Sequence, residues 1–103
     1  MYFPVKFDLT SASGEVGLTF TGGLTIGTKT GLDLGLGLVY VTDYGEVLPS
    51  GYAILRFGDI TDFSFGIGFG FPAGFILQTS INKIIFDFGI LPEKITIGGG
   101  YAF

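Results

Sequence analysis

A strict alternation of large and small side chains runs through Phe63-Ser64-Phe65-Gly66-Ile67-Gly68-Phe69-Gly70-Phe71, where every odd position is Phe or Ile and every even position is Gly or Ser. Such alternation places the two sets on opposite faces of a β-strand. The run opens a stretch without charged residues, 63–82, which a hydropathy scan would associate with a membrane-spanning helix. The period of two and the repeated glycines argue against a helix. The stretch therefore predicts a strand.

The same alternation recurs along the chain and predicts seven further strands. Turn-forming residues separate them, as at 11–14, 28–31, 58–62 and 91–94. The strands are roughly 8–12 residues long, which matches the ~9–11 residues that cross a bilayer at a tilt. No linker divides the chain, so we expect one domain, 1–103. The alternation covers 3–10, 16–27, 32–41, 52–57, 63–71, 75–81, 84–90 and 95–103.

Composition excludes several classes of function. The chain contains no Cys, His or Trp, and its formal net charge is −4. Without Cys there is no disulfide, thiolate nucleophile or sulfur-based zinc site, and without His the usual general base at neutral pH is missing. A negative charge disfavours a nucleic-acid partner, which needs a basic face. We expect no enzyme activity, no cofactor, no metal site and no nucleic-acid partner.

The two faces of the predicted strands differ in kind. All 12 Phe residues fall on one face with most of the Leu and Ile, whereas Gly, Thr and Ser dominate the other. An eight-stranded barrel has an interior just wide enough for side chains, so it would struggle to enclose the large apolar face. With the large residues inside, the small-residue face would meet water, and it carries only five charged residues. A soluble surface normally has about 25–35% charged residues. Both problems disappear if the large residues face lipid, which predicts an all-β, antiparallel, up-and-down transmembrane β-barrel of about eight strands.

Five charged residues share the small-residue face of the predicted strands. In a membrane barrel they would project into the lumen, where buried charges must pair. We expect an ion-pair network that fills the lumen, with a narrow aqueous path as the alternative. Their formal sum is −1, so a pore would favour cations weakly. These lumen charges are Lys6, Asp8, Asp33, Arg56 and Asp87.

The end of the chain, Thr96-Ile97-Gly98-Gly99-Gly100-Tyr101-Ala102-Phe103, resembles the C-terminal β-signal of bacterial outer-membrane proteins. That signal has a polar residue, a glycine two positions later, an aromatic or apolar residue and a final aromatic. The matching positions are Thr96, Gly98, Tyr101 and Phe103.

Taken over the whole chain, the sequence is similar to the small OmpA- and OmpX-like barrels. The resemblance implies a place in the bacterial outer membrane and a barrel-assembly machinery as partner. With the first strand starting in the periplasm, 43–51 and 91–94 would lie outside and 28–31 and 58–62 inside. The longest connection, 43–51, would then lie outside, as is usual for this class. Trp is absent and Tyr is scarce, so the expected aromatic girdle is weak.

The predicted function is that of a non-enzymatic membrane barrel, either structural or a narrow pore, with membrane lipid or detergent as its partner. Residues 1–6 lack the basic start and apolar core of a signal peptide, so we expect a mature form or a de novo designed barrel in a synthetic membrane. Two alternatives stay open: a β-sheet subunit of a self-assembling filament or shell, and a soluble β-barrel that binds an apolar ligand. Whether one chain closes its own barrel, or a homo-oligomer shares one, is also open.

Overall fold

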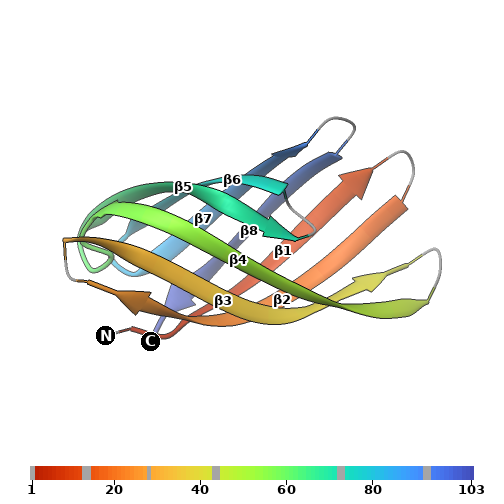
Figure 1. Cartoon of the computed structure of the whole chain (residues 1–103), viewed down its shortest axis with the longest axis horizontal. Helices are drawn as coiled ribbons and strands as arrows, with labels where there is room; N and C mark the ends of the chain where they lie inside the picture. Colours follow the sequence, from red (N-terminus) through yellow and green to blue (C-terminus); the bar gives the residue numbers. More distant parts are fainter. Residues whose placement is uncertain (1, 13–14, 28, 43–44, 72–73, 92–93) are drawn as a thin grey trace.

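A computed structural model describes residues 2–12, 15–27, 29–42, 45–71, 74–91 and 94–103. Each strand pairs antiparallel with its neighbour in the chain, and the last pairs with the first, so one chain closes an eight-stranded up-and-down barrel (Figure 1). This confirms the predicted all-β fold class. None of the described residues belongs to a helix long and apolar enough to cross a bilayer. The strands are β1 (Pro4–Ala12), β2 (Glu15–Ile26), β3 (Thr30–Val41), β4 (Glu46–Gly58), β5 (Phe63–Phe71), β6 (Gly74–Ile81), β7 (Ile84–Leu91) and β8 (Lys94–Ala102).

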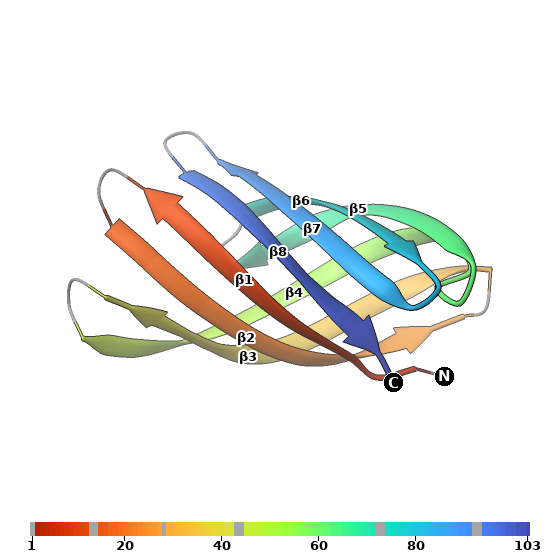
Figure 2. The ribbon, with the colours of Figure 1, turned by 180° about the vertical axis from the view of Figure 1, so that it is seen from behind.

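The pairing of β1 with β8 closes the barrel. Its register runs from Pro4 opposite Ala102 to Ala12 opposite Lys94, and Figure 2 shows the two strands side by side with both termini at the same end. Phe3 N and Phe103 O are 2.8 Å apart and Phe103 N and Phe3 O are 3.0 Å apart, which extends the ladder by one pair. Apart from 46–50 of β4, which pairs on one side only, the described strands leave no open sheet edge, and their backbone groups are paired around the ring.

The division of the strand side chains into inward and outward ones follows the predicted alternation. Eleven of the twelve Phe side chains are exposed on the outer surface, and the twelfth, Phe75, is half-buried. In β4, the large apolar Leu55 and Phe57 point outward, while Ile54 and Arg56 are completely buried. The structure thus places the large apolar face outside and the small-residue face inside.

The predicted long connection at 43–51 is wrong. Strand β4 begins at Glu46, so only 42–45 separates it from β3, and 43–44 lie outside the described residues. Pro49 lies within β4 opposite Leu38 of β3, rather than in a loop. The ladder with β5 reaches only Gly51, so 46–50 is an overhang with one paired side, where a residue without N–H is tolerated.

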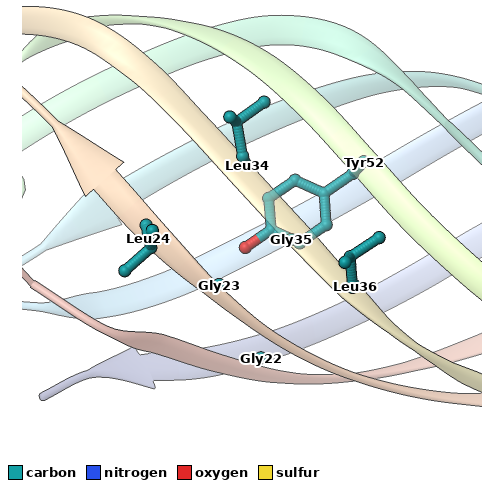
Figure 3. Close-up of a pocket in the computed structure, with 7 residues that line it drawn as sticks. All are labelled: Gly22, Gly23, Leu24, Leu34, Gly35, Leu36 and Tyr52. Atoms are coloured by element: carbon teal, nitrogen blue, oxygen red, sulfur yellow. The ribbon is translucent and has the colours of Figure 1, made fainter.

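A glycine pair in the barrel wall leaves room for a large side chain inside. Gly23 of β2 and Gly35 of β3 are opposite each other, and Tyr52 of β4 is opposite Gly35 on the other side. A Cβ atom added at Gly35 would overlap the Tyr52 ring, so the ring lies directly over this glycine. Figure 3 shows the ring behind β3, between Leu34 and Leu36. An aromatic ring that covers a glycine in a neighbouring strand restores the packing the glycine gives up.

We expect Gly35→Ala to lower the free energy of unfolding by about 1–3 kcal/mol, because the new methyl group must displace the buried Tyr52 ring. Gly22→Ala is the matched control, since a Cβ atom there meets nothing within 4 Å. Urea titration followed by far-UV circular dichroism measures both. Equal losses of stability in the two variants would show that Gly35 acts through its backbone conformation and not through its contact with the Tyr52 ring.

Candidate functional site

The barrel interior holds more polar than apolar side chains. Among the described residues, seven hydrophobic and fourteen polar or charged side chains are buried, the reverse of a water-soluble core, where Asp, Lys and Arg are almost never buried unless paired. The buried polar residues are Lys6, Asp8, Thr10, Thr19, Thr21, Thr25, Asp33, Ser50, Arg56, Ser64, Gln78, Ser80, Asp87 and Thr96.

All five lumen charges lie inside the barrel, and four of them form two ion pairs. Lys6 Nζ of β1 is 2.7 Å from Asp87 Oδ2 of β7, and Arg56 Nε of β4 is 3.0 Å from Asp33 Oδ1 of β3. All four side chains are at most 3% exposed. Asp33 and Arg56 belong to adjacent strands, whereas Lys6 and Asp87 belong to strands that are separated by β8. Each of the four charges has a partner of opposite sign, as buried charges require.

Gln78 of β6 joins the two ion pairs into one chain of contacts. Its Oε1 atom accepts a hydrogen bond from Lys6 Nζ at 3.3 Å, and its Nε2 atom donates one to Asp33 Oδ2 at 3.2 Å. The contacts therefore run across the lumen from Asp87 through Lys6, Gln78 and Asp33 to Arg56. Gln78 was not predicted as a site residue, although its inward position in the alternation of 75–81 was a usable signal.

The guanidinium group of Arg56 is fixed by the backbone as well as by Asp33. It donates to the carbonyl oxygen of Gly27 at 2.8 Å, to that of Ile26 at 3.4 Å and to that of Gly58. These carbonyls lie at the ends of β2 and β4. Arg56 therefore uses its donors to tie two strand ends together and leaves little capacity to bind a passing anion.

Tyr52 completes the packing around Lys6. The Lys6 Nζ atom lies 3.6 Å from the centroid of the Tyr52 ring, within the range of a cation–π interaction. The other side of this region is apolar, because Tyr52 clusters with Ile54 and Ile76. Tyr52 was also not predicted as a site residue, although it shares the inward parity of Arg56.

Asp8 is the lumen charge without an ion pair among the described residues. It lies opposite Gly98 of β8, and so does Asp87 from the other side. A Cβ atom at Gly98 would overlap the Asp8 carboxylate. The glycine thus makes room for the carboxylate.

The four residues of the predicted β-signal divide between the two faces of β8. Thr96 is buried, and its Oγ1 atom is 2.8 Å from Thr10 Oγ1. Gly98 faces Asp8, as described above. Tyr101 and Phe103 are exposed, with ring centroids 5.1 Å apart in an edge-on arrangement. Their role as an assembly signal stays a prediction.

The lumen is closed by apolar side chains at the end that carries the termini. Ile60, in the connection between β4 and β5, is only 2% exposed and packs with Ile85 and Ala102. The turn is held over this end by a hydrogen bond from Lys83 N to Ile60 O at 2.9 Å. We call this Ile60 side chain the Ile60 plug. The alternation pattern did not predict it, because Ile60 belongs to a turn.

The Asp59 carboxylate of the same connection acts within the turn. Asp59 Oδ1 accepts hydrogen bonds from the Thr61 hydroxyl at 2.7 Å and from Thr61 N at 2.9 Å. The hydrogen bond from the Thr61 hydroxyl has the larger effect, and together the two bonds hold the pKa of Asp59 below its ordinary value. The Asp59 carboxylate therefore stays ionised, and accepts both bonds, down to a lower pH. Within the described ranges, no group of three or more acidic side chains is arranged to hold a metal ion.

An apolar depression lies in the outer wall near the Gly23–Gly35 pair. It has a volume of about 580 Å³, and its lining combines glycines with three leucines and the buried Tyr52 ring (Figure 3). The lining residues are Gly22, Gly23, Leu24, Leu34, Gly35, Leu36 and Tyr52.

The fold and the interior define a closed eight-stranded antiparallel barrel with a polar, ion-paired lumen and an apolar exterior. Comparisons with protein-family models, with curated proteins and with solved structures found no match.

We expect Arg56→Met to lower the free energy of unfolding by about 3–5 kcal/mol, because it leaves the Asp33 carboxylate buried without its cation. Adding Asp33→Asn removes that charge and should recover part of the loss. Lys29→Met is the control, since it removes an exposed cation. Urea unfolding of the three variants tests this. A loss in Arg56→Met no larger than in Lys29→Met would contradict a structural role for the pair.

Proposed function

We propose that the chain is an integral membrane β-barrel with a closed lumen, which serves as a structural membrane element and not as an enzyme. The observation that carries this proposal is the inverted distribution of side chains. Thirty large hydrophobic residues of the described chain are exposed, and Leu36 reaches 79% exposure. The interior, in contrast, holds two buried ion pairs.

The placement of the remaining charges supports a lipid environment. In the described chain, the charged residues outside the lumen lie in connections or at the first residue of a strand. The barrel thus has an uncharged apolar band between two charged ends, the pattern of transmembrane barrels. Monomers in water rarely expose apolar patches larger than a few hundred Å². These charged residues are Lys29, Glu46, Asp59, Asp62, Lys83 and Lys94.

The dimensions of the barrel fit the same environment. The strands have 8 to 13 residues, and tilted strands of about 9–11 residues cross the hydrocarbon layer. Two exposed tyrosines lie near opposite ends of the barrel, Tyr40 near the end of β3 and Tyr101 near the end of β8. Tyrosine is enriched at the membrane–water interface.

The lumen supports a scaffold more than a pore. Four of its five charges are paired with each other, and Ile60 covers the end with the termini. The similarity of 96–103 to a β-signal and the short connections support an outer-membrane barrel delivered by an assembly machinery, or a designed barrel that uses the same principles. The soluble apolar-ligand alternative needs the large apolar face to point inward, whereas it points outward here.

We expect the protein to fold only when detergent or lipid is present, because closure alone does not cover the apolar band. A folded barrel should migrate faster on a gel than the boiled sample, and planar bilayers should show no discrete conductance steps. Folding as a monomer in plain buffer would overturn the membrane assignment. Regular conductance steps would keep the membrane barrel but replace the scaffold with a pore.

A charge placed on the apolar band distinguishes lipid from water more sharply. In lipid vesicles we expect Leu36→Arg, in the middle of β3, to lower stability by about 2–4 kcal/mol, and Val47→Arg, at the start of β4, by about 0–1 kcal/mol. Both native side chains are exposed, so a water-soluble barrel would tolerate both changes within about 0.5 kcal/mol. Urea unfolding from vesicles measures the difference, and equal small effects would contradict the proposal.

A further inference from the structure

We propose that the folded barrel binds one proton in its lumen, held by Asp8 and hydrogen-bonded to Asp87, and that this proton makes the stability of the barrel depend on pH. Asp8 belongs to β1 and Asp87 to β7, and both residues are at most 9% exposed. The site lies inside the barrel, so it does not depend on whether lipid or water surrounds the outer wall.

Gly98 of β8 brings the two carboxyl groups together. It lies opposite Asp8 on one side and opposite Asp87 on the other. Because Gly98 has no side chain, the Asp8 Oδ1 atom occupies the place that a Cβ atom would take there. The Asp8 carboxyl group thus reaches over β8 towards β7, where it is in hydrogen-bond contact with the Asp87 side chain.

A contact between two carboxyl groups requires a proton. An ionised carboxylate only accepts hydrogen bonds, and two carboxylates that share a buried site do not both stay ionised. Three buried oxygens of the pair have no hydrogen-bond partner in the described part of the chain, namely Asp8 Oδ1, Asp87 Oδ1 and Asp87 Oδ2. A proton on one carboxyl group turns it into a donor to the other, which removes the repulsion and supplies a missing hydrogen bond.

Lys6 determines which of the two groups carries the proton. Its Nζ atom lies 2.7 Å from Asp87 Oδ2, which stabilises Asp87 as the ionised partner. The same ammonium group is engaged by Gln78 and by the Tyr52 ring. Asp8 has no ion pair among the described residues. The proton therefore resides on Asp8, which donates it in a hydrogen bond to Asp87.

The other charged groups of the described chain leave Asp8 without a cation. Lys94 of β8 lies opposite Ala12, four residues further along β1, and Arg56 is paired with Asp33. The five lumen charges thus comprise three acids and two cations, and one bound proton makes them neutral as a group. The other polar groups that line this part of the lumen are uncharged at neutral pH; they are Thr19 and Thr21 of β2, Tyr52 of β4 and Thr96 of β8.

The sign of the pH dependence follows from this proton. In the unfolded chain Asp8 ionises at about pH 4, like any exposed aspartate, whereas the folded barrel retains the proton to higher pH. Over that interval the folded state binds one proton more than the unfolded chain, so its stability falls as the pH rises. The loss ends where Asp8 ionises in the folded barrel, because both states have then released the proton.

The test measures urea unfolding of the native chain from about pH 5 to about pH 9, above the range in which exposed carboxyl groups titrate, in whichever medium the protein folds. The chain contains no His, the side chain that usually titrates in this range. We expect the folding equilibrium constant to fall by up to about tenfold per pH unit until Asp8 ionises, and then to level off.

Two variants assign the slope to this site. Asp8→Asn should remove it and should be more stable than the native chain at the alkaline end, because the amide donates to Asp87 at every pH. Asp59→Asn, which neutralises a carboxylate in the β4–β5 turn, is the matched control and should keep the slope.

An infrared spectrum reads the proton directly and needs no unfolding. At about pH 6 exposed carboxyl groups are ionised, so the C=O stretching band of a protonated carboxyl group should come from Asp8 in the folded native chain and disappear in Asp8→Asn. If Asp8→Asn does not fold, Asp87→Asn carries the assignment. It frees Lys6 to pair with Asp8, which should then ionise and lose the band.

Two results would overturn the inference. Absence of the band from the native chain at about pH 6 would show that both carboxyl groups are ionised and share the Lys6 ammonium group. A band and a slope that persist unchanged in Asp8→Asn, or in Asp87→Asn where only that variant folds, would place the proton elsewhere.

Discussion

The narrow interior of a closed eight-stranded ring constrains every other feature of this protein. Once β8 pairs with β1, each inward side chain shares a lumen that is only just wide enough for side chains. A large residue such as Tyr52 therefore fits only because Gly35 lies beneath its ring, and the Asp8 carboxylate fits because Gly98 lies beside it. The same lack of volume leaves the large apolar residues on the outside.

The ion-paired chain across the lumen fixes how the strands are aligned. Lys6, Gln78 and Asp33 come from three different strands, and their contacts exist only in the observed registers. A slip of one residue in β1 would move Lys6 and Asp8 to the apolar exterior. Replacing such buried pairs by apolar residues is often neutral for stability, so their contribution here lies in the register that they select as well as in free energy.

The sequence predicted the number, order and facing of the strands because alternation is a local property that each strand carries by itself. It failed at 46–50, because the first four residues of the β4 overhang, 46–49, are exposed on both faces and need no alternation. It predicted which charges point inward but not their partners, since the pairing of Lys6 with Asp87 depends on the contact between distant parts of the chain. Gln78 and Tyr52 carried the inward parity but no charge, and the Ile60 plug left no periodic signal because it lies in a turn.

Closure of the lumen supports the proposed scaffold over a pore. In an open aqueous channel, water would hydrate the inward side chains and compete for the contacts among them. Here Ile60 covers one end of the lumen, and the side chains around Tyr52 fill its middle. The ion pairs of Lys6 with Asp87 and of Arg56 with Asp33 are thereby cut off from bulk solvent, and opposite charges attract more strongly away from water. The closed interior therefore strengthens the contacts that select the strand register, whereas a lumen open to water would weaken them.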